Sequence, residues 1–190
     1  AKTRGFLMGA TSGRTTLNGE GLQHQDGHGL LFASAYPSCQ AYDPTFSYEV
    51  AVLVQRGIER MYGRGEDIFY YITLLNENYV HPEMPDDVAD GIEKGMYLFR
   101  KAPAGPAAVQ LMGSGAILRE VLPAADLLEA NHGVAADVWS ATSFTELGRD
   151  VREVERWNRL HPEKKPRESY IAGAMSKHDG PIVAATDWVR

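Results

Sequence analysis

Short apolar segments typical of buried strands alternate along this chain with longer segments of helical periodicity, and this alternation constrains the fold most. Residues 67–75 are rich in β-branched and aromatic side chains, which predicts a central strand. Residues 36–41, 108–112, 135–141 and 182–185 are further strand candidates. Parallel strands need long crossover connections, which are usually helical, so the alternation predicts an α/β fold with mainly parallel sheets covered by helices.

Two predicted helices lie in the first half. Asp43-Pro44 is typical of an N-cap followed by a first-turn proline, which predicts a helix from Pro44 to Tyr62 that ends at Gly63. Its apolar residues extend over most of its surface, so we expect this helix to be mostly buried. A shorter helix is expected from Asp86 or Asp87 to Lys94.

Two longer helices are predicted in the second half. One covers residues 116–131, where Pro123 should kink or shorten it. The other follows the capping-box pattern of residues 143–146 and reaches Leu160, with a break expected near Gly148. On this last helix, the apolar positions expected to face inward are Val151, Val154, Trp157 and Leu160.

The segment at 102–106, Ala-Pro-Ala-Gly-Pro, is the best candidate for a linker. It predicts one domain over residues 1–101 and a second over residues 107–190. The chain begins at Ala1 without an initiator methionine, and we expect it to be a piece of a longer polypeptide.

Composition excludes several functional classes. The 190 residues include 25 acidic and 19 Lys or Arg side chains, a net charge of −6 that disfavours a general nucleic-acid binder. No apolar run approaches the roughly 18–20 residues that span a bilayer. The single cysteine, Cys39, cannot form an internal disulfide, suits a reducing compartment and is expected to be an inert buried thiol.

Titratable side chains concentrate in the glycine-rich segment 18–29, which contains Glu20, His24, Asp26 and His28. Such groups on a backbone that can approach a ligand closely suit a catalytic loop, but a solvated surface loop has the same composition. The spacing of His24 and His28 would suit zinc on a helix, which the neighbouring glycines disfavour. The glycine spacing matches neither known phosphate-binding pattern.

The sequence Gly113-Ser114-Gly115 follows a predicted strand and precedes a predicted helix. A structural tight turn is the favoured interpretation, and an anion site at the helix N-terminus is the alternative.

The three tryptophans are too widely spaced to indicate a binding platform.

Residues 13–24, Gly-Arg-Thr-Thr-Leu-Asn-Gly-Glu-Gly-Leu-Gln-His, with Asp26-Gly27-His28, closely resemble the homodimeric bacterial pyruvate dehydrogenase E1 components. These are thiamine diphosphate (ThDP) enzymes of the transketolase superfamily. Further matching strings cover nearly the whole chain, at residues 42–44, 48–52, 59–63, 70–73, 75–79, 113–115, 142–147, 156–158 and 160–162.

The resemblance implies the end of a pyrimidine-binding domain and most of a C-terminal domain, both α/β. It also implies that the main anchors of ThDP and Mg²⁺ lie outside this chain, which is expected to hold no metal itself. The position of His24 then acts as acid or base at the substrate-derived hydroxyl, and Glu20 lies beside it. Asp26 and His28 are placed nearer the rim. Gln25 departs from the family pattern, which often has an acidic residue there.

The implied activity is ThDP-dependent decarboxylation of pyruvate and transfer of the acetyl group to a lipoyl group of the dihydrolipoyl acyltransferase partner. The implied partners also include the rest of the same polypeptide and a second E1 subunit, in the cytoplasm, with no nucleic acid and no membrane. Two alternatives stay open. One is a transketolase-like or 2-oxoglutarate-specific relative, and the other is a non-catalytic dimerisation and docking portion.

Overall fold

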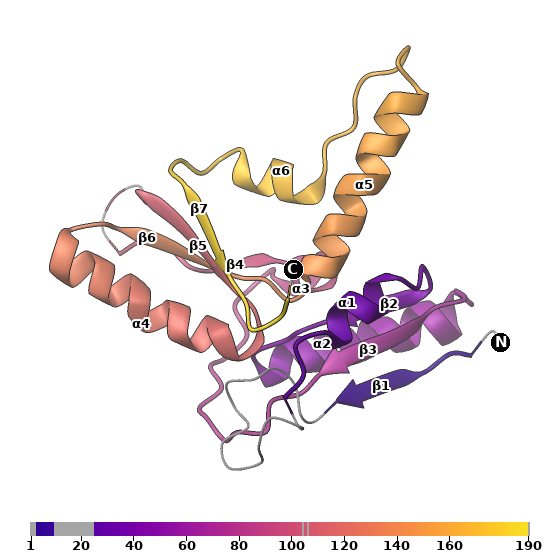
Figure 1. Ribbon diagram of the computed structural model, residues 1–190, viewed down its shortest axis with the longest axis horizontal. Coiled ribbons are helices and arrows are strands. Elements are labelled where there is room, and N and C mark those ends of the chain that lie inside the picture. The colour runs from indigo at the N-terminus through magenta and orange to yellow at the C-terminus, as the bar shows by residue number, and fades with distance from the viewer. Residues whose placement is uncertain (1–2, 10–24, 104, 106, 190) are drawn as a thin grey trace.

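The computed structural model describes residues 3–9, 25–103, 105 and 107–189, which form two sheets with helices packed around them (Figure 1). The first sheet has the order β1-β3-β2 and the second the order β4-β6-β5-β7. The strands are β1 (Phe6–Gly9), β2 (Cys39–Tyr42), β3 (Phe69–Thr73), β4 (Tyr97–Arg100), β5 (Val109–Gly113), β6 (Ala136–Ser140) and β7 (Ile182–Ala185). All pairings are parallel except that of β4 with β6, which confirms the predicted α/β class.

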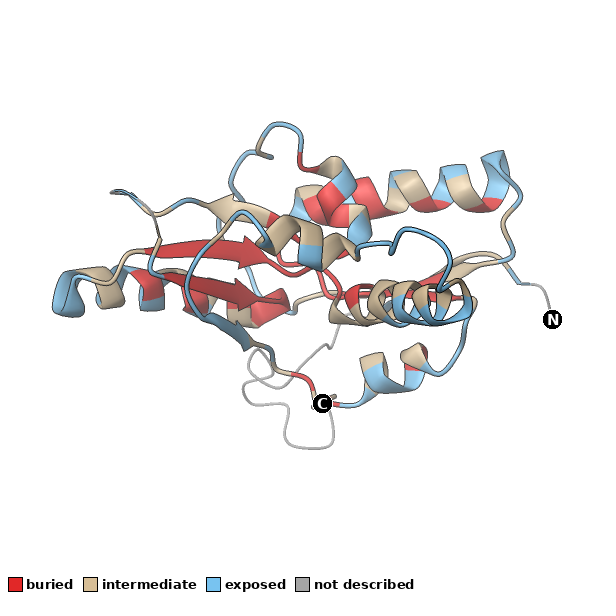
Figure 2. Ribbon diagram, turned by 90° about the horizontal axis from the view of Figure 1, so that it is seen from above, coloured by how far each residue is buried: buried red, intermediate tan, exposed pale blue. Residues whose placement is uncertain are grey.

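The predicted central strand is the middle strand of the first sheet, and its alternating side chains supply two cores. Tyr70 and Ile72 face the cluster formed with helix α2 (Ser47–Ile58). Phe69 and Tyr71 face the opposite side, where helix α1 (Gly29–Ser34) packs on β2. Buried residues accordingly gather in the strands and on the inward faces of the helices (Figure 2).

Helix α2 departs from the prediction at its start and in its burial. It begins at Ser47, with Phe46 at the N-cap, so the prediction of Asp43 as the cap is wrong. Asp43 is instead drawn into a buried polar cluster described below. One face of α2 is buried while Ile58 is 49% exposed, so the expectation of a mostly buried helix is also wrong. A π-helical turn (Glu59–Gly63) then ends the helical segment at the predicted glycine.

The second sheet begins before the predicted linker. Strand β4 pairs antiparallel with β6 although it precedes residues 102–106, and helix α3 (Ala89–Lys94) ends just before it. A division at residue 101 would therefore separate β4 from its sheet. This strand was not predicted from the sequence.

Helix α4 (Gly115–His132) runs through Pro123, so the expected shortening is wrong. Pro123 is exposed, where the loss of one backbone donor is tolerated, and buried Leu118, Val121 and Ala125 hold the helix against its sheet.

Helix α5 (Phe144–Leu160) is also continuous, which contradicts the predicted break at Gly148. It extends away from the body of the molecule before the chain returns through α6 (Tyr170–Met175) (Figure 1). Leu160 is consequently 58% exposed rather than inward-facing.

No helix among the described residues is long and apolar enough to cross a membrane.

Candidate active site

The carboxyl ends of strands from both sheets meet at one place, which we call the junction: Asp43, Thr73, Ser114, Thr142 and Trp188. Each of these residues ends or follows a strand. The backbone amide of Asp43 donates to the Thr142 carbonyl at 2.7 Å, which joins the end of β2 to the end of β6. Carboxyl ends of parallel strands are where α/β proteins place their binding sites, so the junction is the natural place to look for function.

Asp43 lies at the centre of the junction and is buried. Its Oδ1 accepts from the Thr73 hydroxyl at 2.5 Å, and its Oδ2 accepts from the Ser114 hydroxyl at 2.8 Å and from Trp188 Nε1 at 2.9 Å. Burial raises the pKa of the Asp43 carboxyl, and the three donated hydrogen bonds oppose that rise. Its oxygens are therefore occupied by protein donors, which makes Asp43 an anchor between the two sheets.

The turn Gly113-Ser114-Gly115 connects β5 to α4 as predicted. The Gly115 amide donates to the Asp43 carbonyl at 3.0 Å, and a Cβ at Gly115 would lie 2.6 Å from both carboxyl oxygens of Asp43. The carboxylate beside this helix N-terminus is thus the protein's own, which supports the structural interpretation of the turn.

A second buried carboxyl, Glu49 on α2, also links the two halves. Its Oε1 accepts from the Tyr97 hydroxyl at 2.7 Å and the Ser140 hydroxyl at 2.6 Å. Its Oε2 accepts from the backbone amides of Thr45 and Phe46 at 2.6 and 2.9 Å. Burial raises the pKa of Glu49 while these four donors oppose the rise.

The described end of the glycine-rich segment packs against the junction. Asp26 Oδ1 accepts from the amides of His28 and Gly29, both at 2.9 Å, and so satisfies the start of α1. The Tyr71 hydroxyl also lies beside Gly29, since a Cβ there would be 2.7 Å from that hydroxyl and 2.3 Å from Asp26 Oδ2. The pKa of Tyr71 is raised to about 12, mainly by burial and further by the negative charge of Asp26.

His28 is exposed, and its ring stacks on Phe32 with the centroids 6.1 Å apart. Asp26 is half-buried and bound to backbone, so the structure brings these two predicted residues together at the start of α1. Glu20 and His24 lie outside the described residues, as does most of the glycine-rich segment, so the zinc interpretation of His24 with His28 is not tested.

An apolar cleft of about 550 Å³ opens beside the junction, between α1, the start of α5 and the end of β7. Leu30, Leu31, Phe144 and Trp188 contribute its apolar wall, and Arg152 contributes a charge. Its lining on α1 begins at Leu30, two residues after His28.

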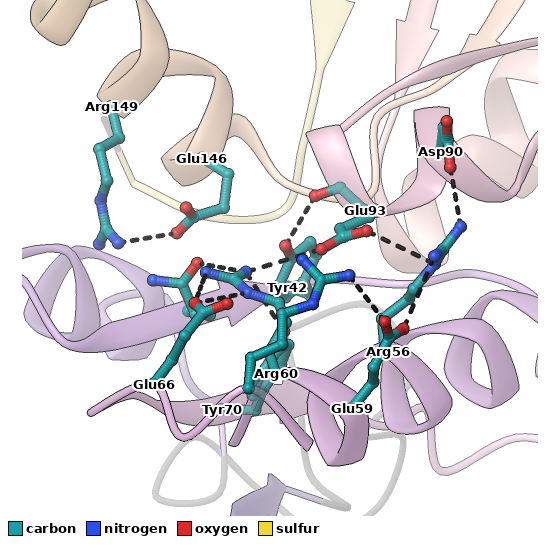
Figure 3. A network of polar contacts seen from close by, with 12 residues as sticks. Tyr42, Arg56, Glu59, Arg60, Glu66, Tyr70, Asp90, Glu93, Glu146 and Arg149 are labelled. Carbon is teal, nitrogen blue, oxygen red and sulfur yellow. Dashed lines mark hydrogen bonds and ion pairs between the residues drawn. The ribbon is translucent and has the colours of Figure 1, made fainter. Parts of the chain in front are cut away.

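A larger cleft of about 680 Å³ lies between α2, α3 and α5 and is lined mainly by charged side chains (Figure 3). Arg60 pairs there with Glu66 at 2.8 Å and with Glu93 at 3.7 Å, and Arg149 pairs with Glu146 at 3.4 Å. Because these cations are compensated by carboxylates, we interpret the network as one that joins helices rather than as an anion site.

Cys39 is 2% exposed, and burial raises the pKa of its thiol to about 11, which confirms the prediction of an inert thiol. Among residues 3–9, 25–103, 105 and 107–189, no group of three or more His, Cys, Asp or Glu side chains could hold a metal ion. The carboxyls of Asp43 and Glu49 are committed to protein donors.

Sequence reasoning missed the roles of Asp43 and Trp188. A signal was present, since Asp43, Ser114 and Thr186 each directly follow an apolar strand, and such positions converge at the carboxyl edge of a parallel sheet. That pattern does not predict that the carboxyl edges of the two sheets face each other. Only the tertiary structure shows this.

Two family models match the chain. Residues 95–190, about half of the chain, match the transketolase-like C-terminal domain, and residues 1–82 match the pyruvate dehydrogenase E1 component middle domain. The chain therefore belongs to the transketolase-like family. Within that family, it is similar over its whole length to pyruvate dehydrogenase E1 components, as the sequence resemblance implied.

The pyruvate dehydrogenase E1 component of Cupriavidus necator is 56% identical over 191 residues, which cover all of this chain and 21% of that protein. That of Escherichia coli is 53% identical over 190 residues, again with all of this chain and 21% of the relative covered. The chain thus spans about a fifth of the length of these relatives.

Among solved structures, the transketolase of Campylobacter jejuni is similar with a TM-score of 0.66 at 17% identity. The match covers 95% of this chain and 23% of that chain. This similarity supports the fold.

Proposed function

We propose that the protein containing this chain is the E1 component of a pyruvate dehydrogenase complex. The observation that carries the proposal is identity of more than half over the whole chain with pyruvate dehydrogenase E1 components. The proposed activity is decarboxylation of pyruvate followed by transfer of the two-carbon unit, as an acetyl group, to a lipoyl group. The proposed cofactors are ThDP and Mg²⁺.

When bound, ThDP supplies a nucleophilic carbon and an electron sink for decarboxylation of a 2-oxo acid. As the family resemblance implies, we assign the main anchors of the diphosphate to the rest of the polypeptide. This chain's own contribution is proposed to be acid–base chemistry and positioning. His24 holds or moves a proton at the substrate-derived hydroxyl, and Glu20 supports the charged form of that histidine.

Asp26 and His28 are assigned to the rim of the site. This is consistent with the exposed ring of His28 and the use of the Asp26 carboxyl to cap α1. The segment between the two sheets, after β3 and before β4, is the proposed domain boundary, because β4 pairs only in the second sheet. The proposed partners are the remaining chain, a second E1 subunit and the lipoyl-bearing dihydrolipoyl acyltransferase, in the cytoplasm.

The test is substrate-dependent turnover by the full-length protein with ThDP and Mg²⁺. Purified enzyme is given pyruvate, 2-oxoglutarate or a ketose phosphate, and reduction of an artificial electron acceptor or transfer of the two-carbon unit is measured. We expect turnover with pyruvate only. Preference for 2-oxoglutarate or a ketose phosphate would favour the alternative relatives, and a dimer without turnover on any substrate would favour the non-catalytic role.

A further inference from the structure

The residues that follow β7 connect the junction to the segment that follows His24 in the chain. Trp188 is 7% exposed, and its Nε1 donates to Asp43 Oδ2 at 2.9 Å. The next residue, Val189, donates its backbone amide to the Gly27 carbonyl at 2.9 Å. Thr186 Oγ1 lies 2.9 Å from Ser114 Oγ. Residues 186–189 therefore bond to the ends of β2 and β5 and to Gly27 within one short stretch.

The other side of residues 26–29 is held equally closely. Asp26 accepts from two backbone amides of its own segment, at His28 and Gly29. A Cβ at Gly29 would lie 2.3 Å from Asp26 Oδ2 and 2.7 Å from the Tyr71 hydroxyl, so the segment fits tightly against the first sheet. From the other side, the residues after β7 hold this segment through the Val189 amide, which donates to the Gly27 carbonyl.

We propose that Trp188 is a positioning residue for the reaction, which acts through Asp43 and through the adjoining backbone bond to Gly27. This inference rests on the proposed function, in which His24 transfers a proton. His24 precedes Gly27 by three residues in the sequence. The indole N–H fixes residues 186–189 on a buried carboxyl, and those residues then fix Gly27. Since small misplacements of a reacting group are costly, loosening Gly27 slows turnover without removing any group that binds substrate.

The experiment compares Trp188→Phe with Trp139→Phe in the full-length enzyme. Both tryptophans are buried, and both substitutions keep an aromatic ring but remove an indole donor, which in Trp139 bonds Gln110 Oε1 at 2.8 Å. Trp139 lies in β6, and its indole N–H is bonded to Gln110 rather than to Asp43 or the segment of Gly27. It therefore controls for the loss of a buried indole hydrogen bond alone.

Two measurements are made on each variant. Steady-state kinetics should show kcat of Trp188→Phe reduced by up to about 100-fold while KM for pyruvate changes little. Hydrogen exchange of peptides covering residues 25–34 should be faster in Trp188→Phe than in wild type. Trp139→Phe should match wild type in both. If Trp188 had only a structural role, the kcat values of the two variants would fall alike. KM for pyruvate would then change together with kcat.

Equal kcat in Trp188→Phe and Trp139→Phe, or unchanged exchange of residues 25–34 in Trp188→Phe, would overturn the proposal. If Trp188→Phe does not fold, Thr186→Val replaces it, because Thr186 is exposed and the change removes only the bond to Ser114 and a 3.4 Å contact from the Trp188 amide. An equal kcat in Thr186→Val and Trp139→Phe, or unchanged exchange of residues 25–34, would then overturn the proposal. A wild-type enzyme inactive on pyruvate would overturn the proposed function, while exchange would still show whether Trp188 holds residues 26–29.

Discussion

Asp43 is the titratable residue of the junction, and it is buried with three side-chain donors on its carboxyl, so its ionisation contributes to stability. Burial raises the pKa of Asp43 in the folded protein above the value of about 3.9 expected in the unfolded chain. The folded state therefore binds more protons than the unfolded state in the pH range above that value. Because the slope of the unfolding free energy with pH follows the difference in bound protons, this contribution falls as pH rises.

We expect Asp43→Asn to be less stable than wild type at acidic pH, because its amide cannot accept all three hydrogen bonds. The deficit should shrink as pH rises from about 4 towards 8, since only the wild type then carries a buried negative charge. Melting temperatures of both full-length proteins across this range would show the trend. Glu49→Gln is the matched comparison at the second buried carboxyl. A deficit that is constant or grows with pH would contradict the assignment.

A second prediction at the residue scale concerns the three candidate side chains of the glycine-rich segment. His24→Ala should lower turnover by about 10²–10⁴-fold while sparing ThDP binding, as expected for a general acid or base remote from the diphosphate. Glu20→Gln should cost less and shift the pH optimum if its charge tunes His24. His28→Ala should be mild, because its ring is exposed. Steady-state and single-turnover kinetics rank the three, and a more damaging His28→Ala would refute the ranking.

At the scale of elements, helix α4 has a glycine with positive φ at each end, but only one end is crowded. Gly115 has φ +50° and faces the Asp43 carboxyl, whereas Gly133 has φ +65° and has no atom within 4 Å of a Cβ. Both glycines permit a backbone conformation that other residues adopt at a cost of about 1–2 kcal/mol. The start of α4 therefore depends on contact with the first sheet, while its end depends on conformation alone.

Gly115→Ala should lower the melting temperature of the full-length protein clearly more than Gly133→Ala does. The shared cost is backbone strain, and the additional cost is displacement of Asp43 from its three donors. Thermal unfolding of the two variants beside wild type measures both costs. Equal shifts would mean that the Asp43 contact contributes little.

At the scale of the whole molecule, the chain forms two sheets joined by buried carboxyls, and it spans about a fifth of the length of its relatives. Because we assign the main anchors of ThDP and Mg²⁺ to the rest of the polypeptide, we expect residues 1–190 alone to bind ThDP no more tightly than about 1 mM, with or without Mg²⁺. Titration calorimetry with the isolated chain, and with the full-length protein as the positive control, measures this. Micromolar, magnesium-dependent binding to the isolated chain would show that the cofactor anchors lie within it.

How much could be predicted from the sequence differs between fold and site. The central strand at 67–75 and the Gly113–Gly115 turn follow from local patterns, and the structure confirms both. Ser143 caps α5 as predicted, with its hydroxyl accepting from the Glu146 amide at 2.9 Å. Strand β4 was not predicted, and its antiparallel pairing with β6, about 40 residues later, is a long-range contact that local patterns do not show.

Local patterns determined which segments of this chain became strands and helices, because apolar periodicity and turn residues act within a few positions of each other. The resemblance of residues 13–28 to one enzyme family likewise needed only the order of the amino acids. Only the tertiary structure decided that Asp43 is no helix cap, since three donors from β3, β5 and the end of β7 outcompete a single helix N-terminus. Those donors lie 30 to 145 positions away, beyond the reach of any local rule.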